Sequence, residues 1–264
     1  MDEIDRRALQ EAKALLENPG LAARLVNVVG RPIEEGLKYL PERVREQISD
    51  VTRKALLGSL KVALSTVNGS SGWQSSRLAN KLGAAAAGGV GGFFGMPGLA
   101  VELPVSTTIM MRAIATIARE NGEDTESPET RMACLEVFAL GGRSESDDGT
   151  ETGYYAVRAA MAKVVGDAVA FLARGSGTLA GREAPALLRL ISRVAERFSI
   201  QVTEKAAAQA LPVVSAATAA AVNVLFINHF QDMATGHFAV RRLERKYGPE
   251  TIRTIYDSLP SRPN

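Results

Sequence analysis

The sequence predicts an all-α protein: a multi-helix bundle around a buried helical hairpin rich in glycine and alanine. Alanine occurs 40 times in the 264 residues, whereas the aromatic residues total 14. Alanine is the best helix former, while aromatic and β-branched residues favour strands. Apolar residues recur at steps of three and four in several segments, which is the spacing of a helix face. No pair of alternating segments flanks a hairpin turn, so we expect no sheet.

Residues 1–75 are predicted to hold the N-terminal helices and a linker. Pro32 is expected to open a short helix. Pro41 marks the first turn of a longer one, because the amide proton that proline lacks would be unpaired there. Apolar positions spaced for one face of this second helix run over residues 44–67. The glycine- and serine-rich stretch 68–76 then predicts a connecting loop.

Residues 76–258 are predicted to form a larger helical region that is continuous with the first as one globular unit. A serine cap, a proline and an acid at residues 127–129 predict a helix over 128–140. Gly141 and Gly142 end it, and the polar stretch 143–153 reads as a surface loop and the main internal breakpoint.

Four further segments complete the expected helical region. Helical spacing predicts helices over 154–173 and 183–210, and another over 231–247. Gly248 and Pro249 separate that helix from a short final one. Residues 259–264 are expected to be a frayed tail.

Two segments carry no formal charge: residues 82–101 and residues 206–231. In the first, the pairs Gly88/Gly92 and Gly91/Gly95 have the small-residue spacing that lets helices approach closely. We expect both segments to be helices packed against each other as the central hairpin. The alternative is a hairpin inserted in a membrane, because twenty residues can span a bilayer. Seven glycines, Pro97 and polar residues such as His229 oppose insertion.

Three charged residues, Glu102, Arg112 and Glu136, each lie among apolar neighbours in the sequence. An unpaired buried charge is costly, so we expect Glu102 or Glu136 to pair with Arg112. Together with His229 these residues are the candidate catalytic set, with a glutamate as base and the arginine to hold an anion. The competing interpretation is an internal ion pair that sets helix register.

Composition and motifs argue against several other classes of protein. Lysine plus arginine total 31 against 29 acids, so no cationic field points to nucleic acid. Cys134 is the only cysteine, which excludes an intrachain disulfide and a cysteine-rich metal site. The only histidines, His229 and His237, stand outside any His-Glu-x-x-His pattern, so no metal site is predicted. Without a Gly-x-Ser-x-Gly elbow or a phosphate loop, we expect no cofactor.

The end of the predicted helix over 231–247 is basic, with Arg241, Arg242, Arg245 and Lys246. Such a cluster either stabilises the negative helix terminus or contacts an anionic lipid surface. The start of the chain carries acids and no apolar core of the kind a secretory signal has. We therefore expect a cytoplasmic protein, peripheral on the inner face of the membrane.

Five strings resemble the EcsC family of bacterial proteins. They are residues 98–118, 122–124, CLEVFALGG at 134–142, YYAVR at 154–158 and GHFAVRRLERKYG at 236–248. The resemblance implies a helical protein whose founding members are encoded beside an ABC transporter linked to secretion and membrane processes, and it implies no agreed reaction.

From the resemblance and the residues together we expect a non-enzymatic, membrane-associated accessory protein that binds a membrane lipid, a membrane protein or a hydrophobic ligand. The alternatives are a hydrolase-like enzyme with a buried Glu/Arg/His site and a scaffold that binds only protein.

Overall fold

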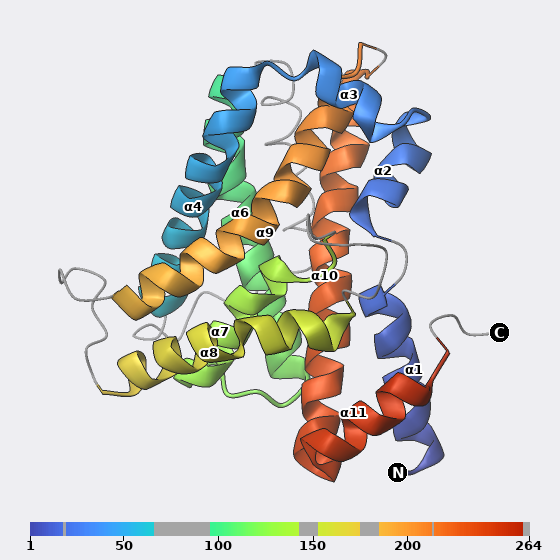
Figure 1. Ribbon diagram of the computed structural model, residues 1–264, viewed down its shortest axis with the longest axis vertical. Helices are drawn as coiled ribbons and strands as arrows, with labels where there is room; N and C mark the ends of the chain where they lie inside the picture. The colour runs from blue at the N-terminus through green and yellow to red at the C-terminus, as the bar shows by residue number, and fades with distance from the viewer. Residues whose placement is uncertain (18–19, 66–95, 143–152, 175–184, 213, 261–264) are drawn as a thin grey trace.

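The computed structural model describes residues 1–17, 20–65, 96–142, 153–174, 185–212 and 214–260. Within these ranges the chain forms ten α-helices and one 3₁₀ helix, with no strand, which confirms the all-α prediction (Figure 1). In chain order the elements are α1 (Glu3–Glu17), α2 (Leu21–Val29), α3 (Ile33–Tyr39), α4 (Glu42–Ser65), α6 (Met96–Glu120), α7 (Pro128–Glu136), η2 (Val137–Ala139), α8 (Tyr154–Ala173), α9 (Pro185–Ala210), α10 (Ala216–Tyr247) and α11 (Pro249–Ser258).

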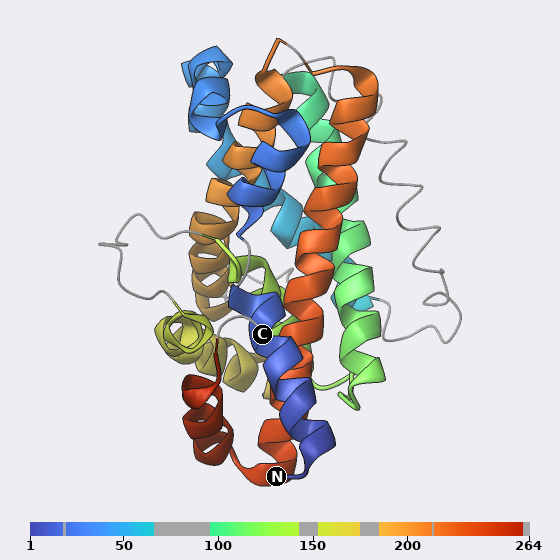
Figure 2. The same ribbon diagram turned by 90° about the vertical axis from the view of Figure 1, so that its right-hand side faces the viewer.

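The 32-residue helix α10 is the element around which much of the bundle is built. Helices α1, α2, α6, α9 and α11 all pack against it (Figures 1 and 2). A second group surrounds α9, where α2, α3, α4 and α8 pack. Helix α4 also packs along α6, and α7 packs on α8. The N-terminal helices therefore contact helices from the second half of the chain on several sides.

Helix α1 runs beside the C-terminal half of α10 (Figure 2). Its apolar face buries Leu9, Ala12 and Leu16. The buried amine of Lys13 donates hydrogen bonds of 2.8 Å to the backbone carbonyls of Tyr256 and Leu259. These carbonyls lie at the C-terminal end of α11, where helix carbonyls lack intrahelical partners. Lys13 thus joins the first helix of the chain to the last.

Local signals in the sequence placed most helix starts correctly. Pro32 is the cap of α3, and Ser127 caps α7 by accepting a hydrogen bond of 3.1 Å from the amide of Thr130. Helix α7 changes to 3₁₀ geometry at Val137, so the predicted helix over 128–140 has a tighter final turn. Gly141 follows with a φ of 72°, a conformation that glycine adopts without strain.

The predicted boundary at residue 231, between the helix expected in the run 206–231 and the helix over 231–247, is wrong, because one helix continues through it. Helix α10 begins at Ala216, where the hydroxyl of Ser215 accepts a hydrogen bond from the amide of Thr218. Its first half lies in the uncharged run 206–231, where few polar residues mark a solvent face. That run is not a single helix, because α9 ends at Ala210 before α10 begins.

The described residues include only part of the hairpin expected from the two uncharged runs. Gly88, Gly91, Gly92 and Gly95 lie outside the described residues. The first run enters the described structure at Met96, where α6 begins, and α6 packs along α10. Among the helices in the described ranges, none is both long and apolar enough to cross a membrane.

Two other glycines occupy tight helix contacts. A methyl group added at Gly36 of α3 would overlap the backbone carbonyl of Ala207 in α9. A methyl group at Gly236 of α10 would lie 2.7 Å from Cγ of Leu16 in α1. Neither glycine belongs to a pair of small residues four apart that the sequence analysis singled out. Single glycines thus mark two close approaches between described helices, and the paired glycines lie outside the described residues.

Candidate functional site

Glu102, a predicted catalytic residue, is buried in an ion pair that the sequence analysis did not anticipate. The Nζ atom of Lys205 in α9 donates to Oε1 of Glu102 in α6 at 2.5 Å. The expected pairing with Arg112 is wrong, because Arg112 is exposed on α6. Ten residues along a helix turn the side chain by about 80° from the starting direction, which places Arg112 on another face.

Lys205 is a residue that the sequence analysis missed. It is 1% exposed, and its amine also lies 5.0 Å from the ring centroid of Phe226. Its spacing in the sequence could have indicated that Lys205 is buried, because Phe198, Val202 and Lys205 follow one face of α9 at steps of four and three. Glu102 and Lys205 neutralise each other's charge, which favours a structural role for the pair over a catalytic one.

Glu136 lies in a different cluster, formed where α7, α8 and α10 meet. Arg158 of α8 donates bidentate hydrogen bonds of 2.7 and 3.1 Å to Glu244 of α10. Arg241 of α10 does the same to Glu123, at 2.9 and 3.2 Å. Among the described residues Glu136 has no ion pair of its own. Its burial raises the carboxyl pKa to about 7, against the opposing field of the two arginines.

The same cluster contains His237 and Tyr154, both buried. The hydroxyl of Tyr154 and Nδ1 of His237 share a hydrogen bond of 3.0 Å. Burial lowers the pKa of His237 well below its usual value and raises that of Tyr154, so both are neutral near pH 7. We refer to Glu123, Glu136, Tyr154, Arg158, His237, Arg241 and Glu244 as the polar core. Its two arginines are paired with Glu123 and Glu244, whereas Glu136 has no ion pair in the described structure.

The other predicted histidine, His229, is fully buried and outside the polar core. Neither of its ring nitrogens has a hydrogen-bond partner among the described residues. Burial lowers the pKa of His229 to about 3, with Arg24 adding a smaller effect in the same direction. Nearby, a methyl group at Gly141 would lie 2.7 Å from the imidazole. A neutral imidazole packed this closely fills space in the core.

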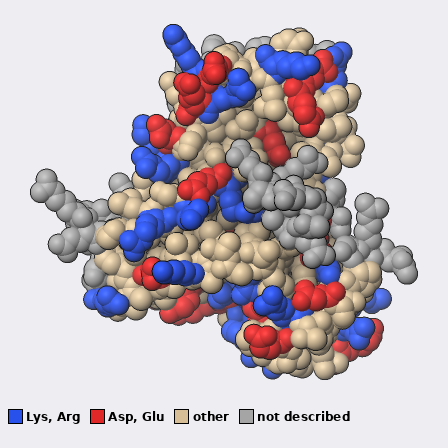
Figure 3. All heavy atoms as spheres, viewed as in Figure 1, with Lys and Arg blue, Asp and Glu red and all other residues tan. Residues whose placement is uncertain are grey.

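The predicted lipid-contacting residues are mostly engaged within the chain. Arg241 and Arg245 both pair with Glu123, and Lys246 pairs with Asp5 at 2.6 Å and with Asp2 at 3.4 Å. Arg242 is exposed. Figure 3 shows cations and acids interspersed over the face that it displays. The basic end of α10 therefore offers less free positive charge than its sequence indicates.

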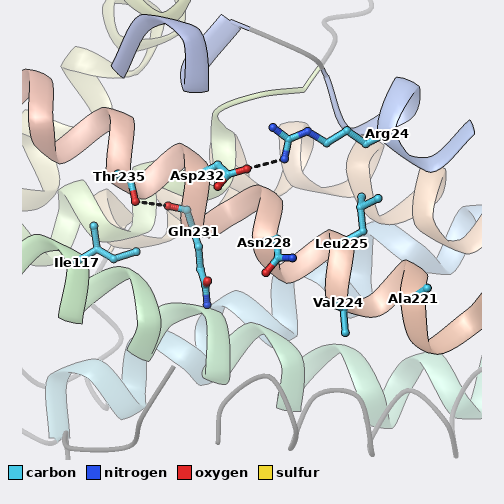
Figure 4. A pocket seen from close by; sticks show the side chains of 9 residues that line it. All are labelled: Arg24, Ile117, Ala221, Val224, Leu225, Asn228, Gln231, Asp232 and Thr235. Atoms are coloured by element: carbon cyan, nitrogen blue, oxygen red, sulfur yellow. Dashed lines mark hydrogen bonds and ion pairs between the residues drawn. The ribbon is translucent and has the colours of Figure 1, made fainter. Parts of the chain in front are cut away.

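A cleft lies between α2, α6 and α10, and the sequence analysis did not predict it. Its volume is about 690 Å³, within the range of small-molecule sites. We call it the α2/α6/α10 cleft (Figure 4). The described residues that line it are Arg24 of α2, Ile117 of α6 and, from α10, Ala221, Val224, Leu225, Asn228, Gln231, Asp232 and Thr235.

The cleft changes in polarity along α10. Ala221, Val224 and Leu225 form an apolar end. The polar end contains an ion pair, in which Nη1 of Arg24 lies 2.6 Å from Oδ2 of Asp232 (Figure 4).

Two amide side chains at the polar end carry unsatisfied atoms. Oδ1 of Asn228 and Nε2 of Gln231 are buried atoms without a hydrogen-bond partner in the described structure. Buried polar atoms in native proteins are nearly always paired with protein or with ordered water, so each of these two atoms calls for a partner.

A family model described as the EcsC protein family matches residues 3–243. The chain belongs to the EcsC family. The match begins in α1, so the EcsC region includes the N-terminal helices as well as residues 76–243. A search of curated proteins found no match to the chain, and a search of solved structures found none either.

Four of the five strings that carry the EcsC resemblance contribute residues to the polar core. Glu123 and Glu136 come from residues 122–124 and 134–142, and Arg158 from 154–158. Their partners Arg241 and Glu244 come from 236–248, on α10. The string 122–124, which precedes α7, and the string 154–158 of α8 are therefore both ion-paired to the string 236–248 on α10. The α10 residues of the cleft all precede Gly236, so they lie outside the strings, whereas Ile117 of α6 belongs to the string 98–118.

Proposed function

We propose that this EcsC family protein is an accessory protein of a membrane process, and that it acts by binding an amphipathic, lipid-like ligand in the α2/α6/α10 cleft. The observation that carries the proposal is the polarity of the cleft, which has apolar side chains at one end and mostly polar side chains at the other, where Ile117 is the apolar exception (Figure 4). Amphipathic molecules have the same division.

The dimensions of the cleft suit one acyl chain. Its α10 residues extend from Ala221 to Thr235, about 21 Å at the rise of an α-helix. The chain of the ligand would lie against Val224 and Leu225, which are partly exposed in the free protein. Covering this apolar surface would contribute about 25 cal/mol per Å² removed from water.

The hydrolase alternative has less support. Glu102 is committed to Lys205, Arg112 is on the surface, and Glu136 belongs to the polar core. None of these three residues is among the described residues that line the cleft. A general base needs to reach the proton that it removes, and the cleft is where a substrate would sit.

The membrane link is proposed to pass through the ligand rather than through the basic end of α10. Only Arg242 of the four predicted lipid contacts is without an ion pair in the described structure. Charge attraction to an anionic bilayer is therefore weaker than four free cations would give. The family resemblance to proteins encoded beside an ABC transporter favours a role in transport or secretion at the membrane.

The proposal is tested with a substitution that fills the apolar end of the cleft. Ala221 is exposed and lines the cleft, so Ala221→Trp would fill part of it. Ala217 is exposed one turn earlier and is not among the lining residues, so Ala217→Trp is the matched control. We expect native mass spectrometry to detect a bound single-chain amphiphile in the native chain and in the control, and much less in Ala221→Trp. Equal binding by all three proteins would refute the cleft as the site.

A further inference from the structure

We propose that the head group taken by the cleft is uncharged and both donates and accepts hydrogen bonds, as a hydroxyl or an amide does. The preferred ligand is then a neutral single-chain lipid, such as a monoacylglycerol or a fatty amide, rather than a fatty acid or a phospholipid. This inference rests on the proposed ligand-binding function and specifies its substrate class.

The charge in the cleft is balanced. Arg24 is the one cation among the described lining residues, and Asp232 is the one anion. Their ion pair of 2.6 Å joins α2 to α10. An anionic head group would have to compete with Asp232 for the guanidinium and would meet the Asp232 carboxylate as a like charge. A cationic head group would meet Arg24 in the same way.

The unpaired atoms call for both a donor and an acceptor. Oδ1 of Asn228 is an acceptor without a donor, and Nε2 of Gln231 is a donor without an acceptor. The two residues are three apart on α10, so their side chains are neighbours on one face of the helix. A hydroxyl supplies one donor and two acceptor positions, and an amide supplies both kinds. A carboxylate or phosphate dianion supplies only acceptors and would leave Oδ1 of Asn228 unpaired.

Other groups at the polar end fit the same head group. The hydroxyl of Thr235 donates to the backbone carbonyl of Gln231 at 2.8 Å, which leaves its lone pairs to accept a hydrogen bond (Figure 4). The Arg24 guanidinium has five N–H groups, and the bond to Asp232 uses Nη1. Its remaining N–H groups suit the ester or amide carbonyl that joins a neutral head group to an acyl chain.

The test compares three probes that share one acyl chain. Monooleoylglycerol, oleamide and oleate are each titrated at pH 8 and below their aggregation concentrations against the native chain, with affinity measured by competition with a fluorescent amphiphile. We expect both neutral probes to bind about tenfold or more tightly than oleate. Tighter or equal binding of oleate would overturn the head-group inference and leave the proposed function standing. If none of the three binds, both proposals fail.

Two variants test whether the amides select the head group. Asn228→Leu removes the acceptor and Gln231→Met removes the donor, while each keeps a side chain of similar size. We expect each variant to lose most of the preference for monooleoylglycerol over oleate and to retain binding of oleate. Thermal unfolding of both variants establishes that they are folded. A folded variant that keeps the full preference would overturn the role given to its amide.

Discussion

Replacing Glu136 by glutamine should make the protein more stable at alkaline pH. Glu136 is 6% exposed, and burial raises its pKa from 4.5 to about 7. The shift, 7 minus 4.5, is about 2.5 pH units, and at 1.36 kcal/mol per unit it corresponds to about 3 kcal/mol. Glutamine has the same shape and no proton to lose.

The direction of this pH dependence follows from whether the folded or the unfolded chain loses the Glu136 proton at the lower pH. Below pH 4.5 both the folded and unfolded chains hold the proton on Glu136, so the group contributes no difference. Between pH 4.5 and about 7 the unfolded chain gives up the proton while the folded chain retains it. Folding stability therefore falls with rising pH across this window, and the loss is constant above it. The Glu136→Gln chain should escape this loss.

The measurement is urea unfolding followed by circular dichroism, at intervals from pH 4.5 to pH 8.5. We expect the stability difference in favour of Glu136→Gln to grow from near zero to about 3 kcal/mol. The control is Glu129→Gln, which removes an exposed carboxylate from the same helix α7. Histidine titration is common to all three proteins and cancels. A difference independent of pH, or a Glu136→Gln chain that is less stable at pH 8, would refute the reasoning.

Three further predictions concern stability. Burial lowers the pKa of His229 to about 3, so the native chain loses stability as pH falls from 6.5 toward 3. His229→Met should weaken this dependence. The prediction is contradicted if the melting temperature of the variant falls between pH 7 and pH 5 by as much as that of the native chain. Gly36→Ala should lower the free energy of unfolding by about 1 to 3 kcal/mol, because the added methyl group meets the α9 backbone. Gly58→Ala, in open space on α4, should raise it by about 0.5 to 1 kcal/mol. Equal effects of the two substitutions in chemical denaturation would disprove the tight contact at Gly36. Lys205→Met should lower the free energy of unfolding by about 3 to 5 kcal/mol, because it leaves Glu102 buried and unpaired. Adding Glu102→Leu should restore much of the lost stability. No recovery in the double variant would argue against the ion pair.

The helix boundaries could be predicted because their causes are local. A proline at the start of a helix, a serine cap and a glycine stop each act over a few residues, as at Pro41, Ser127 and Gly248. Residues 206–231 were expected to be one helix, and the break between Ala210 and Ala216 was not predicted. Packing of α1, α6 and α9 against α10 decides its structure.

Burial of Glu102 and Glu136 was predicted correctly, whereas the burial expected for Arg112 was wrong. Apolar neighbours in sequence do not surround a residue on a helix, because adjacent side chains point in different directions. The partner of Glu102 was equally hard to find, since Lys205 comes 103 residues later in the chain.

The cleft depends on contacts over still longer separations. Arg24 and Asp232 are 208 residues apart, and neither has an unusual sequence context. The uncharged run that contains Asn228 and Gln231 was interpreted as a packing face. In the structure part of that face lines the cleft instead, because α2 and α6 pack to either side of it.

The placement of α1 has a consequence for how the chain is made. Asp2 and its partner Lys246 are separated by 244 residues, so α1 docks on a helix that is synthesised much later. Until α10 emerges, Leu9 and Leu16 lack the helix against which α1 mainly packs, so they are exposed to water or bound by a chaperone. Closing so long a loop makes this docking a late step of folding. A nascent chain stalled before Gly236 should therefore carry α1 undocked, open to proteases that the finished protein resists.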